Sequence, residues 1–155
     1  MTFRIIRFIS PVIKLCLSIR ARLPGGRHAR FVLLPGWCAR ALERGKVALA
    51  ASHARELLRL AAHYPDDWNH GNAIHHGHLT LGRVSLMSGD LAGARSELIA
   101  AGQTSGSPQL CSFGPNMRLA QDLFRAGERD IVLQYFELCR RFWRMGNGAT
   151  RCLDS

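Results

Sequence analysis

The strongest constraint on the fold is a pattern of apolar and small residues that occurs twice, around Gly89 and again around Gly127. In the first copy, apolar residues recur at helical spacing over about residues 72–88, and Gly89-Asp90 then supplies a stop and a new N-cap. A second helical pattern follows and ends at Gly102. Two helices joined by so short a turn pack against each other, so the segment predicts an antiparallel helical hairpin.

The second copy repeats the same arrangement of small and large residues. A small residue in the first helix lets the partner helix approach closely, and a large residue in the second helix fills the seam between hairpins. We therefore expect two hairpins, beginning near Asn72 and Pro115, that share one apolar seam. Superimposing Gly89 on Gly127 pairs Leu81-Gly82 with Leu119-Ala120, Ala94 with Val132, Leu98 with Phe136, and Ala101 with Cys139.

A weaker third hairpin precedes these two. Its first helix is predicted from Trp37 to Arg44 and is short, and its second helix begins at Val47 in a pattern that Pro65 ends. Stacked repeats generally need about three units to bury a continuous core. The predicted fold class is therefore all-α, with stacked antiparallel helical hairpins over residues 37–145 and a flexible tail over residues 146–155.

Residues 1–36 have the composition of a basic leader. Eight Arg or Lys residues and no acidic residue lie between Met1 and Leu42, whereas the rest of the chain carries 13 basic and 11 acidic residues. With Pro and Gly at 24–26 and 35–36, this segment predicts a poorly ordered or adventitious extension; a lone surface helix and a targeting segment are the alternatives. Its longest uncharged stretch is six residues, against about 20 needed to cross a bilayer, so no transmembrane segment is expected.

The sequence contains no motif that couples a nucleophile to a base. It has no Gly-x-Ser-x-Gly, no P-loop and no dinucleotide fingerprint. Five cysteines are scattered without a CxxC pair, which favours reduced thiols and a cytoplasmic location. We therefore expect a protein that is not an enzyme and that needs no cofactor.

The repeated unit resembles the tetratricopeptide-repeat (TPR) family. Leu81-Gly82, Ala94, Leu98 and Ala101 stand where that family places its Leu-Gly, small and bulky positions. The two copies here are offset by 38 residues, against about 34 in the family, and His78 and Asn116 replace the aromatic residues usual in the first helix. The segment SPQLCSFGPNM, residues 107–117, also resembles a group of uncharacterised bacterial repeat proteins. The resemblance implies a TPR-like α-solenoid fragment with ligands on the concave face, which the first helix of each hairpin forms.

Carrying that concave face over position by position gives a predicted groove. Arg83 and Arg125 would flank apolar anchors, an arrangement that suits an acidic peptide or protein partner. The predicted function is thus a protein–protein interaction scaffold without specific nucleic-acid binding. The predicted groove residues are His76, Leu79, Arg83, Leu86, Met87, Met117, Gln121, Phe124 and Arg125.

The sequence leaves two alternative functions and the role of one loop undecided. His70, His75, His76 and His78 could support a metal-dependent activity, but a zinc site wants three or four ligands with a firm second shell, and no HExxH or Cys pair completes one. The basic leader could bind nucleic acid or a membrane surface. The loop over residues 102–115 is expected to connect the hairpins, with Pro108 setting an extended turn; the alternative is that polar side chains offer hydrogen bonds at the mouth of the groove. Those side chains are Ser107, Gln109, Ser112 and Asn116.

Overall fold

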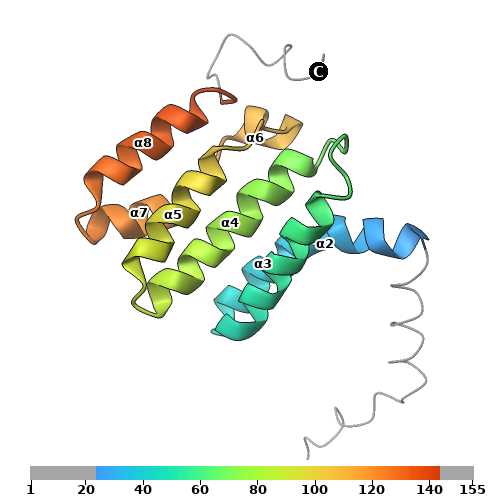
Figure 1. Ribbon diagram of the computed structural model, residues 1–155, viewed down its shortest axis with the longest axis horizontal. Helices are drawn as coiled ribbons and strands as arrows, with labels where there is room; N and C mark the ends of the chain where they lie inside the picture. The colour runs from blue at the N-terminus through green and yellow to red at the C-terminus, as the bar shows by residue number, and fades with distance from the viewer. Residues whose placement is uncertain (1–23, 144–155) are drawn as a thin grey trace, which may run out of the picture.

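The structure is a computed structural model that describes residues 24–143, and every regular element in that range is an α-helix (Figure 1). This confirms the predicted all-α class for the described part of the chain. The helices are α2 (Pro24–Glu43), α3 (Val47–Ala61), α4 (His70–Met87), α5 (Leu91–Gly102), α6 (Pro108–Phe113), α7 (Arg118–Arg125) and α8 (Arg129–Cys139).

Consecutive helices pair into hairpins, α2 with α3, α4 with α5, and α7 with α8. Helix α4 lies in the middle of the molecule, in contact with α3 on one side and α5 on the other, and α5 in turn packs on α8 (Figure 1). Helices α2 and α7 lie on the far side of this row in Figure 1, and both contact α4. The first helices of the other two hairpins therefore both approach α4 from the far side of the row.

The turns within the hairpins are made by glycines in the left-handed region. Gly45, Gly89 and Gly127 have φ values of 66°, 80° and 90°, which side chains with a Cβ rarely adopt. After Gly89, the carboxylate of Asp90 accepts a 2.8 Å hydrogen bond from the backbone N–H of Gly93 and so caps α5. The stop and N-cap predicted at Gly89-Asp90 are thus confirmed.

The second and third hairpins share one apolar core, as the repeat pattern predicts. Gly82 shows why the pattern needs a small residue: a Cβ there would lie 2.3 Å from Cδ2 of Leu119 and 3.1 Å from Cβ of Glu97. A separate cluster, which includes Phe31, Leu34 and Leu57, joins the first hairpin to the start of α4. The shared core consists of Leu79, Ala94, Leu98, Ala101, Leu110, Leu119, Ala120, Leu123, Val132, Tyr135, Cys139 and Phe142.

The boundary predicted at residue 36 is wrong, because it falls inside α2. The helix begins at Pro24 and continues through Pro35, so the first helix is 20 residues long and not the short segment expected from Trp37. Phe31 and Leu34 are completely buried (0% exposed). Burying two large side chains outweighs the one backbone hydrogen bond that a proline removes from a helix interior. The predictions for residues 1–23 and for the tail over 146–155 lie outside the described residues.

An ion pair also ties α2 to α3. The Nη2 group of Arg30 donates to Oε2 of Glu56 over 2.7 Å, and the guanidinium of Arg30 lies 5.2 Å from the ring centroid of Trp37. The hydrogen bond to Arg30 lowers the pKa of Glu56, and the same bond raises the pKa of Arg30. One cation of the predicted leader is thus paired within the fold.

The described thiols are not all reduced. Cys38 and Cys139 are free and buried, and burial raises the pKa of each to about 11, which keeps both thiols protonated at neutral pH. Cys111 is disulfide-bonded, so the expectation of a reduced thiol is wrong there. Between residues 24 and 143, no helix combines the length and the hydropathy needed to cross a bilayer.

Candidate functional site

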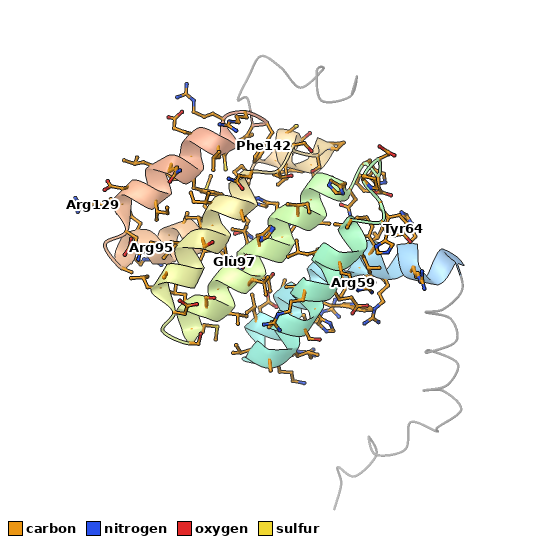
Figure 2. All side chains as sticks on the ribbon, in the orientation of Figure 1. Arg59, Tyr64, Arg95, Glu97, Arg129 and Phe142 are labelled. Carbon is orange, nitrogen blue, oxygen red and sulfur yellow. The ribbon has the colours of Figure 1, made fainter. Side chains whose placement is uncertain are left out.

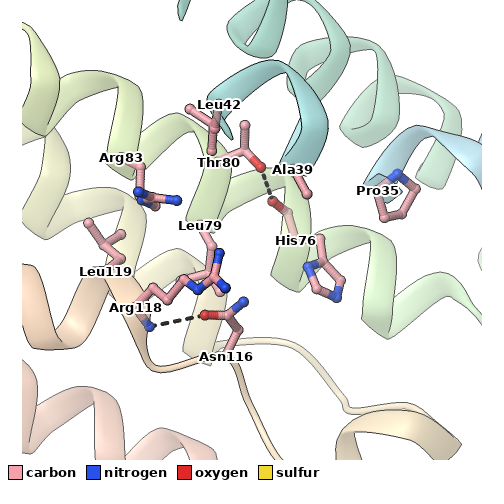
Figure 3. A pocket seen from close by; sticks show the side chains of 10 residues that line it. All are labelled: Pro35, Ala39, Leu42, His76, Leu79, Thr80, Arg83, Asn116, Arg118 and Leu119. Carbon is pink, nitrogen blue, oxygen red and sulfur yellow. Dashed lines mark hydrogen bonds between the residues drawn. The ribbon is translucent and has the colours of Figure 1, made fainter. Parts of the chain in front are cut away.

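A small pocket of about 50 Å³ opens where the first helices of the three hairpins meet (Figure 3). We call it the inter-hairpin pocket. Helix α2 supplies its apolar rim, α4 supplies most of its polar side chains, and the start of α7 closes it. Its walls are Pro35, Ala39, Leu42, His76, Leu79, Thr80, Arg83, Asn116, Arg118 and Leu119.

The charged groups in the wall of this pocket are both arginines. Nε of Arg83 lies 3.9 Å from Oδ2 of Asp122, at the outer limit of an ion pair. The guanidinium of Arg118 has no ion-pair partner among residues 24–143. Two guanidiniums with one distant carboxylate leave the pocket net positive, so it favours an anionic group.

Asn116 is fixed in the wall by three hydrogen bonds. Its backbone N–H donates to Nε2 of His75 over 3.2 Å, and its carbonyl accepts a 3.3 Å bond from the hydroxyl of Tyr135. Its side-chain oxygen accepts from the backbone N–H of Arg118 over 3.0 Å, which Figure 3 shows as a dashed line. Contacts to both α4 and α8 therefore set the point at which α7 begins.

His75 is the buried support beneath Asn116. Its Nδ1–H donates to the carbonyl of Ala101 over 3.0 Å, so Nε2 is the unprotonated nitrogen that accepts from Asn116. Desolvation lowers the pKa of His75 to about 4. The hydrogen bond to Ala101 raises the pKa, but by less than desolvation lowers it. The imidazole is thus neutral at physiological pH, with both nitrogens occupied.

His76 lines the pocket without adding charge to it. It is half-buried, and burial lowers the pKa of its imidazole, which makes the neutral form the dominant one at neutral pH. Its backbone carbonyl accepts a 2.8 Å hydrogen bond from the hydroxyl of Thr80, which is drawn in Figure 3. The positive charge of the pocket therefore comes from the arginines.

A second cavity adjoins the pocket, because His76 and Asn116 belong to the walls of both. We call it the α6 cavity; it encloses about 440 Å³. Phe113 is 86% exposed at its mouth, and Oε1 of Gln109 is buried with no hydrogen-bond partner among the described residues. Its walls are Asn72, His76, Gln109, Leu110, Phe113, Gly114, Pro115 and Asn116.

Helix α6 positions the exposed ring and the unpartnered amide of this cavity. Ser107 caps the helix by accepting a 3.1 Å hydrogen bond from the backbone N–H of Leu110, and Pro108 occupies the first turn. The extended turn predicted at Pro108 is therefore wrong. Of the polar side chains singled out in this loop, Gln109 and Asn116 line the cavity, whereas Ser107 serves as the cap.

The structure places seven of the nine predicted groove residues on two separate surfaces and two on neither. His76, Leu79 and Arg83 line the inter-hairpin pocket, whereas four others line a groove between α7 and α8. Leu86 packs on the shared core and Met87 is 54% exposed at the end of α4. The division arises because α7 turns Arg118 and Leu119, not those four residues, towards α4. The four residues in the α7–α8 groove are Met117, Gln121, Phe124 and Arg125.

Several pocket residues were not predicted from the sequence. Pro35 was missed because the boundary at 36 assigned it to the leader, whereas Ala39 and Leu42 lie in the predicted first helix but were not assigned to the groove. Asn116 was noted as a replacement for an aromatic residue, yet an Asn just after a Pro and just before a helix is itself a capping signal. Arg118 carried no signal beyond its charge.

Three of the four histidines proposed for a metal site, His70, His75 and His78, have separate hydrogen-bond partners. Nδ1 of His70 lies 3.1 Å from the carbonyl oxygen of Ala61, and Nδ1 of His78 lies 2.8 Å from Oε2 of Glu97. His75 is held as described above. Over residues 24–143, no three His, Cys, Asp or Glu side chains come together in a way that could hold a metal ion.

No family model, curated protein or solved structure matches this chain. The function is therefore inferred from the geometry of the site.

Proposed function

We propose that this protein is an interaction scaffold without catalysis, which binds an acidic, extended peptide segment of a partner protein across the inter-hairpin pocket and the α6 cavity. One observation carries the proposal: a cationic pocket that contains Arg83 and Arg118 adjoins a cavity whose walls include the exposed ring of Phe113 and polar side chains. Charge, apolar area and hydrogen-bonding capacity are the three properties by which peptide grooves select their ligands.

The inter-hairpin pocket takes one carboxylate side chain. Its volume of about 50 Å³ suits a group of that size, and arginine guanidiniums bind carboxylates through paired, charge-assisted hydrogen bonds. The long 3.9 Å separation between Arg83 and Asp122 leaves that guanidinium free to turn towards a ligand. Arg118, which has no ion pair in the described part of the chain, is the stronger contact.

The α6 cavity takes the residues next to that carboxylate. The side chains of Asn72, Gln109 and Asn116 in its walls exchange hydrogen bonds with the peptide backbone. An apolar side chain of the peptide packs on Phe113, whose 86% exposure makes it available in the free protein. The preferred ligand thus carries an acidic residue beside an apolar one.

The position of the pocket supports a TPR-like α-solenoid interpretation of the fold. Its walls come from the first helix of the three hairpins, α2 and α4 directly and α7 through its first residues. That is the face on which the tetratricopeptide-repeat resemblance places ligands. The predicted concave face is therefore retained in the proposal for its α4 part and extended to α2, from which the predicted groove took no residue.

The proposal is tested with an array of short peptides that carry Asp or Glu beside an apolar residue, together with matched peptides in which Asn or Gln replaces each acid. Fluorescence anisotropy compares the native chain with Arg118→Glu and with the control Arg140→Glu, which makes the same charge change on the exposed residue that follows α8. We expect acidic peptides to bind the native and control chains. We expect Arg118→Glu to weaken the binding of these peptides at least about tenfold. Equal binding of acidic and amide peptides, or equal affinity for all three chains, contradicts the proposal.

A further inference from the structure

The last hairpin presents a second surface that shares no residue with the pocket or the α6 cavity. This α7–α8 groove is open to solvent and has a volume of about 510 Å³, a size typical of protein sites that bury a ligand. It is therefore a different surface from the proposed peptide site. Its walls are Met117, Ala120, Gln121, Phe124, Arg125, Arg129, Val132, Leu133 and Phe136.

Large apolar side chains are exposed in this groove. Phe124 is 53% exposed, Leu133 61% and Phe136 40%. Single exposed apolar residues are ordinary, but three that line one concave surface mark an interaction site. The groove is thus the largest apolar opening among the cavities described above.

The preceding hairpin indicates what kind of element packs on the corresponding surface. The repeat pattern pairs Phe136 with Leu98 of the preceding hairpin. Leu98 is completely buried (0% exposed) in the core that α7 and α8 complete, because those helices pack on α5. No helix within residues 24–143 packs on Phe136 in the same way. A helix is therefore the element whose shape the groove fits.

The charge of the groove indicates which charge a docked helix would carry. The charged residues in its walls are Arg125 and Arg129, both cationic. The guanidinium of Arg129 lies 5.7 Å from the ring centroid of Phe124 and has no ion pair within the described residues, and its side chain lies at the edge of the molecule in Figure 2. Among the described residues Arg125 pairs with Asp122, at 3.4 Å, and its side chain remains 74% exposed. The rim therefore complements carboxylates.

We propose that the α7–α8 groove docks an amphipathic helix from a partner protein, with its apolar stripe on Phe124, Leu133 and Phe136 and its flanking carboxylates on Arg125 and Arg129. Helix α8 has 11 residues and is about 16 Å long, which matches three turns of a docked helix with anchors at i, i+3 or i+4, and i+7. This surface would let one chain join two partner segments, an extended one and a helical one.

The probe is a synthetic helical peptide of about 18 residues with a leucine stripe flanked by glutamates, and its matched counterpart has lysines in place of the glutamates. Fluorescence anisotropy is measured with the full chain, with Leu133→Ser, and with the control Leu33→Ser, which removes a similarly exposed leucine from α2. The glutamate peptide is expected to bind at least about tenfold more tightly than the lysine peptide. Leu133→Ser is expected to weaken that binding at least about tenfold, whereas Leu33→Ser leaves it unchanged.

Three results would overturn the helix proposal. One is equal affinity for the two helical peptides, and another is the same affinity for Leu133→Ser and the native chain. The third is sedimentation of the native chain as a dimer that Leu133→Ser dissociates, which would assign the groove to a second copy. The acidic extended peptides of the preceding section should bind Leu133→Ser normally, so failure of this proposal is distinguishable from failure of the proposed function.

Discussion

The backbone N–H of Asn116 donates to Nε2 of His75 over 3.2 Å, which links the middle of α4 to the residue that begins the third hairpin. The opposite nitrogen of the same ring donates to Ala101 near the end of α5. One neutral imidazole thus joins two hairpins through opposite edges, and it does so directly behind the wall of the inter-hairpin pocket.

This arrangement predicts a loss of stability in mild acid. The folded-state pKa of His75 is about 4, below the value of roughly 6.5 for an unfolded histidine, so between these values the unfolded chain takes up a proton that the folded chain refuses. Stability is therefore complete above about pH 6.5 and declines towards pH 4, by at most ~3 kcal/mol from this residue. The pKa of His76, whose ring centroid lies 5.7 Å from that of His75, is also lowered by burial, so His76 adds to the same decline.

Urea unfolding of the native chain and of His75→Gln between pH 4.5 and 7.5 isolates the contribution of His75. We expect the variant to be less stable than the native chain at pH 7.5. Because glutamine cannot take up the proton, we also expect the stability of the variant to depend less on pH. Parallel curves for the two chains would show that His75 is not the group that titrates.

The start of α4 is predicted to tolerate no side chain at Gly71. A Cβ there would lie 1.6 Å from the carbonyl oxygen of Gly106, and the carbonyl of Gly71 also accepts a 3.0 Å bond from the hydroxyl of Thr104. Because the clash is with backbone, Gly71→Ala should cost more than about 2 kcal/mol of unfolding free energy. The control is Gly36→Ala in α2, where a Cβ would meet nothing within 4 Å; it should be neutral or stabilise by up to about 1 kcal/mol. Equal thermal shifts for the two variants would contradict this packing.

Helix α2 is predicted to be part of the folded core. Phe31 is fully buried against α3, while its neighbour Val32 is 39% exposed. Phe31→Ala should reduce the free energy of unfolding by about 3–5 kcal/mol, whereas Val32→Ala should cost less than about 1 kcal/mol. Denaturant unfolding of both variants decides the point, since similar small losses would place residues 24–36 outside the cooperative fold.

The parts of the fold that local signals determine could be predicted from the sequence. Gly89 and Asp90 mark a turn through backbone conformation and capping, and Gly82 marks a close helix contact through its missing Cβ. Helix α2 could not be predicted in this way, because Pro35 and Gly36 are locally unfavourable for a helix and only the burial of side chains such as Phe31 compensates.

The candidate site was predictable only in part, for a related reason. Arg83 and His76 were identified because they lie on one face of a long, regular helix. The face that α7 presents depends on where the helix begins, and that is set by contacts of Asn116 with His75 and Tyr135, which are distant in sequence. The division of the predicted groove into two surfaces is thus a tertiary effect.

The proposed function requires an acidic peptide to bind where the first helices of the hairpins meet. Its most direct test is a ¹H–¹⁵N NMR titration of the full chain with the tightest acidic peptide from the array. The account predicts that the largest chemical-shift changes occur at His76, Thr80, Arg83, Asn116 and Arg118, around one pocket. Changes confined to the α7–α8 groove, or no saturable changes at any residue, would contradict it.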